Sequence, residues 1–132
     1  MPLVRNNTIG AKLIASAKTA RRFTVTANAG VTTTETNLRL PVTNLSQVFY
    51  YALMTAGPAG VTFTPEFAVD NFNSGAALAE PDWFPLLVPQ VLVLNVPFFI
   101  TERINANMAS AIFTVPGGGA AATVEIIIAA SQ

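Results

Sequence analysis

The sequence predicts an all-β protein: a single-domain antiparallel β-sandwich, jelly-roll-like, with about eight short strands. Three observations carry this prediction. Apolar and polar residues alternate with period two over most of the chain after Arg22. Turn residues recur about every 8–12 positions. The length of 132 residues suits one domain with one core. We therefore expect a β-sandwich domain over residues 22–132, preceded by a basic N-terminal arm or short helix over residues 1–21.

The N-terminal segment is strongly basic. No acidic residue occurs before Glu35, whereas five of the seven basic residues precede residue 23, namely Arg5, Lys12, Lys18, Arg21 and Arg22. The alanines, lysines and leucine between Ile9 and Ala20 favour a short helix, and an extended arm or a frayed terminus is equally compatible. The clustered charge leads us to expect contact with a neighbouring subunit or an acidic surface.

The first strands are predicted from alternation. One strand starts at Arg22 and ends at the turn Asn28-Ala29-Gly30. Residues 31–36 are rich in threonine and are expected to form a strand or a strand edge. A further alternating run follows, in which Pro41 marks an edge or a strand end. Phe23, Val25 and Ala27 share one face of the first strand, and Leu38, Leu40 and Val42 alternate with Asn37, Arg39 and Pro41 in the later run.

Residues 45–56 are apolar on both faces between Val48 and Met54, which is typical of a strand covered on both sides. A helix capped by Asn44 is the rival interpretation. The aromatic and β-branched residues from Val48 to Tyr51 favour the strand. After a glycine- and proline-rich turn at 57–60, a short strand is expected at 61–64, ended by Pro65.

The second half of the chain is expected to begin with a long loop over residues 65–85, which contains Trp83 and Phe84. Strands are expected at 86–96, with Pro89 at an edge or bulge, and at 98–101, 108–115 and 123–130. The glycines at 117–119 predict a hairpin loop before the last strand. In that strand Val124, Ile126 and Ile128 are expected to face inward.

Composition excludes several classes of function. Cysteine and histidine are absent, so the chain has no disulfide, no thiolate or imidazole metal site and no histidine-based triad. Charged residues make up 11% of the chain and apolar residues 52%, against about 25% charged in ordinary domains. Such a surface is either in a membrane or covered by other subunits. The most apolar stretch, Leu86 to Ile100, contains two prolines and is shorter than the ~20 residues of a spanning helix, so we expect subunit contacts.

No motif indicates catalysis or a bound cofactor. The glycines at 117–119 lack the Lys-Ser/Thr of a phosphate loop. Asp70 to Gly75 only partly resembles a calcium loop, because Phe72 offers no oxygen ligand at the third position. Seven acids could supply a glycosidase-like carboxylate pair, yet no spacing selects one. We expect a protein that is not an enzyme and holds no cofactor or metal.

Nucleic-acid binding is not expected of the folded body. Outside the N-terminal segment the only basic residues are Arg39 and Arg103, and a nucleic-acid interface needs clustered Lys and Arg to neutralise phosphates. The basic arm could contact nucleic acid or the acidic patch of a protein partner.

Consecutive aromatic residues indicate an interface, because neighbours on a strand point to opposite faces and one ring of each pair must leave the core. The outer rings are covered either by the 65–85 loop or by another subunit, where aromatics are enriched and charges depleted; we favour the subunit. The predicted interface residues are Arg5, Lys12, Lys18, Arg21, Arg22, Tyr50, Tyr51, Trp83, Phe84, Phe98 and Phe99.

The chain resembles the decoration or cement proteins of tailed-bacteriophage capsids, or a similar small β-sandwich virion structural protein. The resemblance lies in the alternating strand Phe23-Thr24-Val25-Thr26-Ala27, the basic N-terminal stretch, and the glycine-rich segment that leads into residues 123–131. It is one of style and covers about residues 20–132, and no functional motif of the family carries over residue by residue.

The resemblance implies a sandwich or jelly-roll fold, a homo-oligomer that is most often a trimer, and a place on the capsid surface of a virion assembled from proteins made in the host cytoplasm. The implied partners are the major capsid protein or other virion subunits, and the implied role is to stabilise the shell. Two other classes remain open. One is another virion part, such as a tail, head-completion, fibre or coat subunit. The other is a carbohydrate-binding β-sandwich module that uses Trp83.

Overall fold

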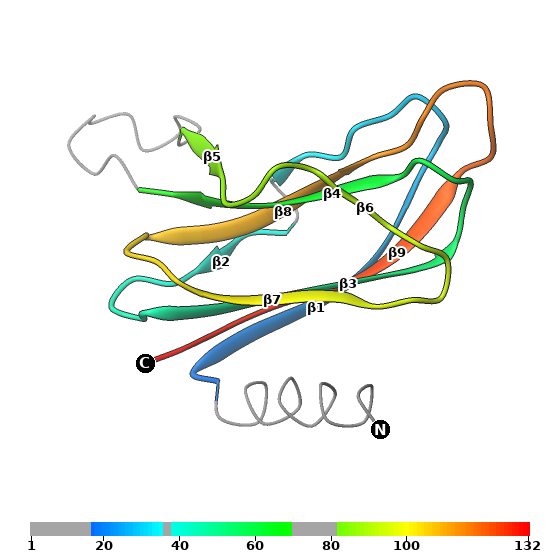
Figure 1. The fold of residues 1–132 in the computed structure, drawn as a ribbon. Coiled ribbons are helices and arrows are strands. Elements are labelled where there is room, and N and C mark those ends of the chain that lie inside the picture. Colours follow the sequence, from blue (N-terminus) through cyan, green and yellow to red (C-terminus); the bar gives the residue numbers. More distant parts are fainter. Residues whose placement is uncertain (1–16, 36–37, 70–81) are drawn as a thin grey trace.

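The structure, a computed structural model, describes residues 17–35, 38–69 and 82–132. Within these residues the chain forms nine strands in two antiparallel sheets that stack face to face (Figure 1). The predicted all-β sandwich is confirmed. The strand count is nine where about eight were expected, and three of the nine strands are only two or three residues long.

The first sheet, sheet A, contains the longest strands. Its order is β1-β9-β3-β7. These strands are β1 (Thr19–Ala27), β9 (Ala122–Ser131), β3 (Gln47–Ala56) and β7 (Phe98–Arg103). Residues 47–56 are therefore a strand, as the aromatic and β-branched content predicted, and this strand is central in its sheet, with β9 on one side and β7 on the other.

The second sheet, sheet B, has the order β2-β8-β4-β5, and β6 pairs with β4 on the same side as β5. Its strands are β2 (Leu40–Pro41), β8 (Met108–Thr114), β4 (Thr62–Ala68), β5 (Trp83–Pro85) and β6 (Gln90–Val91). β5 and β6 thus share one margin of sheet B, and no further strand of the described residues lies beyond them.

The pairings are nested, which defines the jelly roll. β1 pairs with β9, β2 with β8, β3 with β7, and β4 with β5 and β6. Two further pairs, β3 with β9 and β4 with β8, join these hairpin-like layers into two sheets. A chain rolled up in this way presents the inner faces of both sheets to each other, and those faces form the core.

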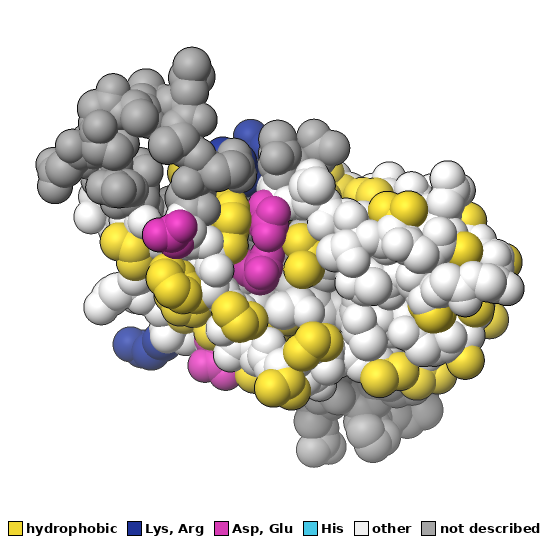
Figure 2. Space-filling view, turned by 90° about the horizontal axis from the view of Figure 1, so that it is seen from above, with side chains coloured by type: hydrophobic (Ala, Val, Ile, Leu, Met, Phe, Trp, Pro, Cys, Tyr) yellow, Lys and Arg dark blue, Asp and Glu magenta, His cyan; other side chains and the backbone are white. Residues whose placement is uncertain are grey.

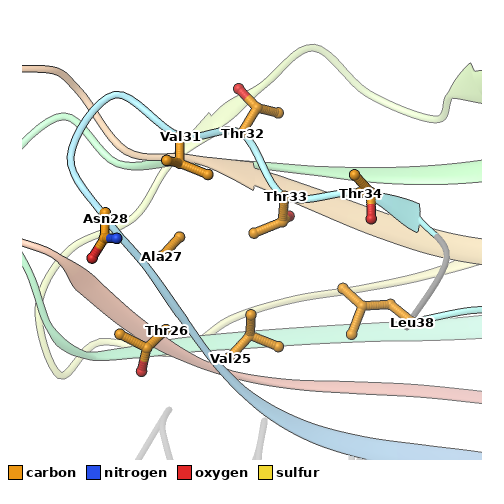
Figure 3. A pocket seen from close by; sticks show the side chains of 9 residues that line it. All are labelled: Val25, Thr26, Ala27, Asn28, Val31, Thr32, Thr33, Thr34 and Leu38. Carbon is orange, nitrogen blue, oxygen red and sulfur yellow. The ribbon is translucent and has the colours of Figure 1, made fainter.

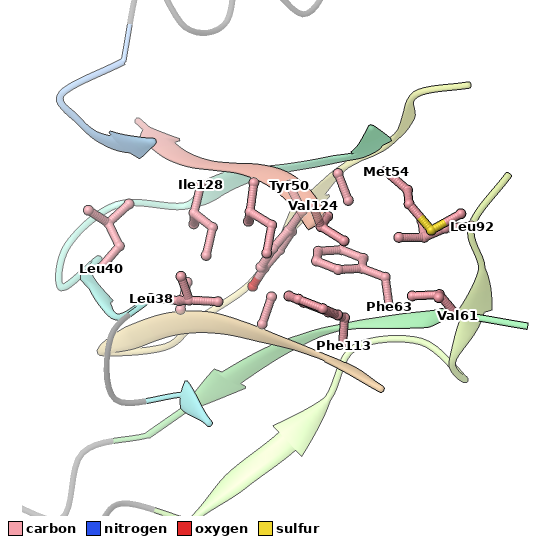
Figure 4. Close-up of a cluster of buried hydrophobic side chains, with 14 of the residues drawn as sticks. Leu38, Leu40, Tyr50, Met54, Val61, Phe63, Leu92, Phe113, Val124 and Ile128 are labelled. Carbon is pink, nitrogen blue, oxygen red and sulfur yellow. The ribbon is translucent and has the colours of Figure 1, made fainter. Parts of the chain in front are cut away.

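The core lies between the sheets, and its largest fully buried side chains include Tyr50, Phe63 and Phe113 (Figure 4). The inward positions predicted for the last strand, Val124, Ile126 and Ile128, are all fully buried. Leu38, Leu40 and Val42, which alternate with Asn37, Arg39 and Pro41 in the sequence, are also buried, at most 1% exposed each. Period-two alternation therefore located the core correctly in these segments.

Pro65 does not end its strand, as had been expected; β4 continues to Ala68. The Pro65 carbonyl accepts a hydrogen bond of 2.9 Å from the Leu86 N–H, so the side of Pro65 that lacks a donor faces the connection between β5 and β6. On its other side β4 pairs without a break with β8. A proline is tolerated in a strand where its missing N–H falls outside the continuous ladder.

The predictions for residues 83–96 were wrong in two respects. Residues 83–85, expected in a loop, form β5, and residues 86–96, expected to form one strand, contain only β6 and a single bridge between Val93 and Val96. Pro89 and Pro97 remove backbone donors, and Asn95 adopts a positive φ of 61°. These three residues interrupt a segment that its apolar composition had predicted to be one strand.

Two connections also differ from expectation. Gly117–Gly119 is not a hairpin loop, because it joins β8 of sheet B to β9 of sheet A. The threonine-rich segment forms one isolated bridge, Thr32 to Thr114, along the margin of sheet B. The first strand begins at Thr19, which places Arg21 and Arg22 within β1. Residues 1–16 and the calcium-loop-like segment 70–75 lie outside the described residues.

Candidate subunit-interaction surface

One continuous segment of the chain displays most of the exposed large apolar side chains. Of the eight such side chains among the described residues, six lie between positions 84 and 96. We call this set the apolar strip; it consists of Phe84, Val88, Val91, Val93, Leu94 and Val96, which are 46–75% exposed. Isolated exposed valines are common on protein surfaces, whereas six exposed large apolar side chains within residues 84–96 make this segment a candidate binding surface.

The apolar strip is held in place by its backbone. The Leu92 N–H bonds to the Val61 carbonyl at 2.8 Å, and the Asn95 N–H bonds to the Met54 carbonyl at 2.9 Å. Leu92 is the one fully buried residue of this stretch, at 3% exposure, and Leu86 packs half-buried against the core. Anchored at these points, the segment crosses from sheet B to β7 of sheet A with the side chains of the apolar strip exposed.

The strip lies at the margin of sheet B. β5 and β6 pair only with β4, so within the described part of the chain their outer backbone edges have no strand beside them. No charged residue occurs between Asp82 and Glu102. Figure 2, which looks down on sheet B, shows apolar side chains spread along its lower margin. An uncharged strand edge is what natural monomers usually avoid, because it pairs readily with another chain.

Two of the predicted interface aromatics belong to the core instead. Tyr50 is fully buried and its hydroxyl donates a 2.9 Å hydrogen bond to the Glu66 carbonyl; burial, and secondarily the charge of Glu66, raise the pKa of its phenol. Phe98 is half-buried and packs on Phe63 with ring centroids 5.9 Å apart. Both side chains fall on the inward-facing positions of strands β3 and β7, and the interface assignment is corrected for both.

Four other predicted aromatics keep some exposure. Tyr51 and Phe99 are opposite each other on β3 and β7, half-buried on the face of sheet A that points away from sheet B. Phe84 is 49% exposed, belongs to the apolar strip and contacts Phe67 at 5.8 Å. The half-buried Trp83 lies 5.8 Å from the Arg39 guanidinium. These aromatics therefore lie on two separate faces.

The predicted basic residues lie apart from the strip. Arg21 and Arg22 are exposed along β1, and Lys18 is exposed just before it, at the margin of sheet A. Arg22 forms an ion pair with Glu125 of β9 at 3.1 Å. Arg5 and Lys12 lie outside the described residues. The structure thus does not unite the predicted residues in one site.

A groove opens where β1 and the threonine-rich segment diverge (Figure 3). Its volume is about 340 Å³, and it is lined by Val25, Thr26, Ala27, Asn28, Val31, Thr32, Thr33, Thr34 and Leu38. Several hydroxyls in it are already engaged: Thr26 with Thr123 at 2.9 Å, and Thr32 with Thr114 at 3.0 Å. With no charged side chain among its lining residues, the groove offers little to select a ligand.

A pair of carboxyl groups lies on sheet B. Glu66 is 7% exposed, and its burial, together with a hydrogen bond that its protonated carboxyl donates to the Glu35 side chain, raises the pKa of Glu66 to about 8. The Ser110 hydroxyl donates a 3.0 Å hydrogen bond to the Glu35 carbonyl, which holds Glu35 beside β8. In the described residues no third acid completes a set that could bind a metal ion. The pair can retain a proton, and nothing in its geometry assigns it a substrate.

Sequence reasoning missed the valines and the leucine of the apolar strip. A signal was present: the strip falls in an uncharged stretch, residues 83–101, which also contains Pro89, Asn95 and Pro97. Residues that interrupt a strand so often prevent some of its apolar side chains from reaching the core. An apolar, uncharged segment with several prolines therefore predicts exposed apolar residues better than it predicts a buried strand.

Comparison with known proteins finds no matching family model and no matching curated protein. Similar solved structures include a mitogen from Yersinia pseudotuberculosis, with a TM-score of 0.44, 10% identity and 86% of each chain covered. They also include infectious bursal disease virus strain Gx, with a TM-score of 0.43, 12% identity, and 86% of this chain and 32% of that chain covered.

A carbohydrate-binding module of Cellvibrio mixtus lichenase 5A, solved with cellotriose, has a TM-score of 0.34 and 13% identity, over 91% of this chain and 95% of that chain. At these scores and identities the likenesses add nothing to the functional argument. No helix among the described residues is long and apolar enough to cross a membrane.

Proposed function

We propose that this protein is a structural subunit of a virion, a capsid decoration or cement protein that acts through protein–protein contacts. The observation that supports this most directly is the apolar strip on an uncharged sheet margin. The low charge of the whole chain, 11%, supports it as well. In this proposal the strip binds a second copy of the chain, and the assembled protein attaches to the major capsid protein.

The free energy that burial of the strip can contribute, compared with the cost of association, favours a symmetric assembly. Fully burying a valine or leucine contributes about 1.5–3 kcal/mol. The strip side chains are only 46–75% exposed, so six of them contribute about 5–10 kcal/mol. Association costs about 4–15 kcal/mol in lost freedom of motion. One strip contact is therefore marginal, and a closed ring, in which every subunit contributes two contacts, is more stable than a single pair.

A trimer is the ring that we favour. Its contacts are heterologous, so the strip of one subunit packs on a different surface of the next. The exposed basic residues Lys18 and Arg21 lie at the margin of sheet A, away from the strip. They remain available to an acidic patch on the capsid, which would give attachment a dependence on salt concentration.

The test compares two variants by sedimentation velocity. Val91→Lys combined with Val93→Lys places two charges on the strip, whereas Val31→Lys changes a 41% exposed valine elsewhere. We expect the strip variant to sediment as a monomer at concentrations where the wild type and Val31→Lys are associated, with a dissociation constant raised at least about 100-fold, because each buried charge costs several kcal/mol. Equal association of all three proteins would contradict the proposal.

A carbohydrate-binding module is the second candidate. The observation in its favour is that Trp83, the only tryptophan, is half-buried at the margin of sheet B, so part of the residue is accessible to solvent. Sugar rings stack on such aromatic faces. Glycan-array binding that disappears in Trp83→Ala and persists in Phe84→Ala would favour this function. Absence of binding in the wild type would exclude it for the glycans on the array.

A further inference from the structure

The apolar strip ends in a tight turn, residues 93–96, whose side chains are unusual for a turn. Val93 and Val96 form an isolated bridge, and the Val96 N–H donates a 3.0 Å hydrogen bond to the Val93 carbonyl. Exposed turn positions are usually occupied by Gly, Pro, Asn, Asp or Ser. Here three of the four residues are large and apolar: Val93, Leu94 and Val96 are 59%, 46% and 50% exposed.

The backbone of the turn requires Asn95 but does not require Leu94. Asn95 is the one residue of the turn with a positive φ, 61°, and asparagine tolerates the left-handed region better than most residues. A polar residue in place of Leu94 would therefore fit the same turn. A leucine exposed between two exposed valines has no role within the fold that would explain it, and such a set is a candidate for a contact outside the subunit.

The turn is fixed to both sheets. The Asn95 N–H donates a 2.9 Å hydrogen bond to the carbonyl of Met54 in β3 of sheet A. Leu92, just before the turn, is buried in the core, and its N–H donates a 2.8 Å hydrogen bond to the carbonyl of Val61, which precedes β4 of sheet B. Leu92, Met54 and Val61 lie at the same end of the core (Figure 4). Leu94 is therefore held in place before any partner binds, which lowers the entropic cost of association.

Val88 provides a contrast within the strip. It is the most exposed strip residue, at 75%, and it lies in a bend. Among the described residues its backbone has one hydrogen bond, a local one of 2.7 Å that its carbonyl accepts from the Gln90 side chain. Ordering a less restrained segment on binding costs free energy. If buried area alone decided affinity, Val88 would matter more than Leu94; preorganisation reverses this order.

We propose that the turn 93–96 is the preorganised centre of the contact between two copies of the chain, with Leu94 as its anchor and Asn95 as its positioning residue. This inference rests on the proposed self-association of the strip. The surface that receives an anchoring leucine is apolar and concave. A second copy suits it because the chain is itself poor in charge, with a further uncharged stretch at residues 104–124, and an unpaired charge buried under the strip would oppose binding.

The first test compares dissociation constants of self-association, measured by sedimentation velocity. Leu94→Ala should raise the dissociation constant at least about 30-fold, and Val88→Ala less than about 5-fold. Equal effects, or a larger effect of Val88→Ala, would overturn the proposal. If Val91→Lys, outside the turn, weakened association in that case, the strip would remain the interface and only the role of the turn would be wrong. A wild type that does not associate would overturn both this proposal and the proposed function.

The second test concerns Asn95. Asn95→Ala disfavours the left-handed conformation and should raise the dissociation constant at least about ten-fold, whereas Asn95→Gly accepts that conformation and should stay within about three-fold of the wild type. The matched control is Asn44→Ala, which makes the same change at a φ of 66° in another loop and should not alter association. An equal loss in Asn44→Ala would overturn the role of Asn95.

A double-mutant cycle separates positioning from a general structural effect. If Asn95 acts through Leu94, adding Asn95→Ala to Leu94→Ala should weaken association by less than about two-fold more. Fully additive losses would contradict the positioning role. Co-sedimentation of the wild type with phosphatidylcholine vesicles that is lost in Leu94→Ala would assign the turn to a lipid surface and overturn the proposal.

Discussion

At the scale of single residues, Glu66 shows why chemistry was hard to foresee. The chain has seven acids, and nothing in their spacing distinguishes one of them. The fold distinguishes Glu66 from the other acids, because Glu66 on β4 is opposite Ser110 on β8, and the Ser110 hydroxyl holds the Glu35 backbone nearby. The pair thus depends on residues far apart in the sequence, brought together by strand register. The same holds for Tyr50, because the alternating pattern did not show whether Tyr50 or the adjacent Tyr51 faces the core.

Glu66 makes stability depend on pH. Its folded-state pKa of about 8 lies above its ordinary value of 4.5, so the folded protein holds a proton that the unfolded chain releases. The contribution to the free energy of unfolding is fully present below about pH 4.5 and is lost as pH rises to about 8. We expect urea titrations to show this decline in the wild type, and Glu66→Gln to abolish it.

The matched control for this prediction is Glu102→Gln on β7, which leaves the Glu35–Glu66 pair intact and should preserve the decline. Glu35→Gln removes the neighbouring charge and should make the decline smaller. If Glu66→Gln followed the same pH course as the wild type, the carboxyl pair would not be the titrating group.

The Tyr50 hydroxyl provides a second residue-scale prediction. Tyr50→Phe keeps the ring and removes the donor to the Glu66 carbonyl, which should lower the free energy of unfolding by about 1–2 kcal/mol. Tyr51→Phe, whose hydroxyl is on the half-buried outer face, should change it by less than about 0.5 kcal/mol. Both are measured by urea denaturation. A loss as large in Tyr51→Phe would refute the different roles given to the two tyrosines.

At the scale of elements, local pattern predicted the strands that are regular. β3, β8 and β9 alternate or are rich in β-branched residues, and their positions were anticipated within about two residues. β5 and β6 were not, because they are held by hydrogen bonds to β4 and interrupted by Pro89. β5 and β6 are strands only because they pair with β4, which lies about twenty positions away in the sequence, and a local hydrophobic pattern contains no information on such a distant partner.

The turn after β3 contributes an element-scale prediction. Gly57 has φ of 151°, and a Cβ there would lie 2.8 Å from Met54 Sδ and 2.8 Å from Ala122 Cβ. Gly57→Ala combines an unfavourable backbone with overpacking and should destabilise the protein by about 2–4 kcal/mol. Gly117→Ala, with no heavy atom within 4 Å of its Cβ, should stay within about 0.5 kcal/mol. Equal thermal midpoints for the two variants would contradict this packing at the turn.

At the scale of the whole molecule, composition and turn spacing predicted the class of fold but not the order of strands. Nothing local indicates that β1 pairs with β9, because their partners are separated by almost the full chain. The interaction surface follows from that order. β5 and β6 form a margin only because β8 occupies the other side of β4. The low charge of the sequence pointed to a covered surface, and the topology shows which margin displays the apolar side chains.

The most direct test of the central claim, that the apolar strip binds a second copy, is the mass of the wild-type protein in solution. We would measure it by light scattering after size exclusion, across a wide range of concentrations. A species of about three times the 13.9 kDa chain mass is the result predicted here. A dimer would retain the strip as an interface and refute the trimer. A monomer at every concentration up to the millimolar range would contradict the claim itself.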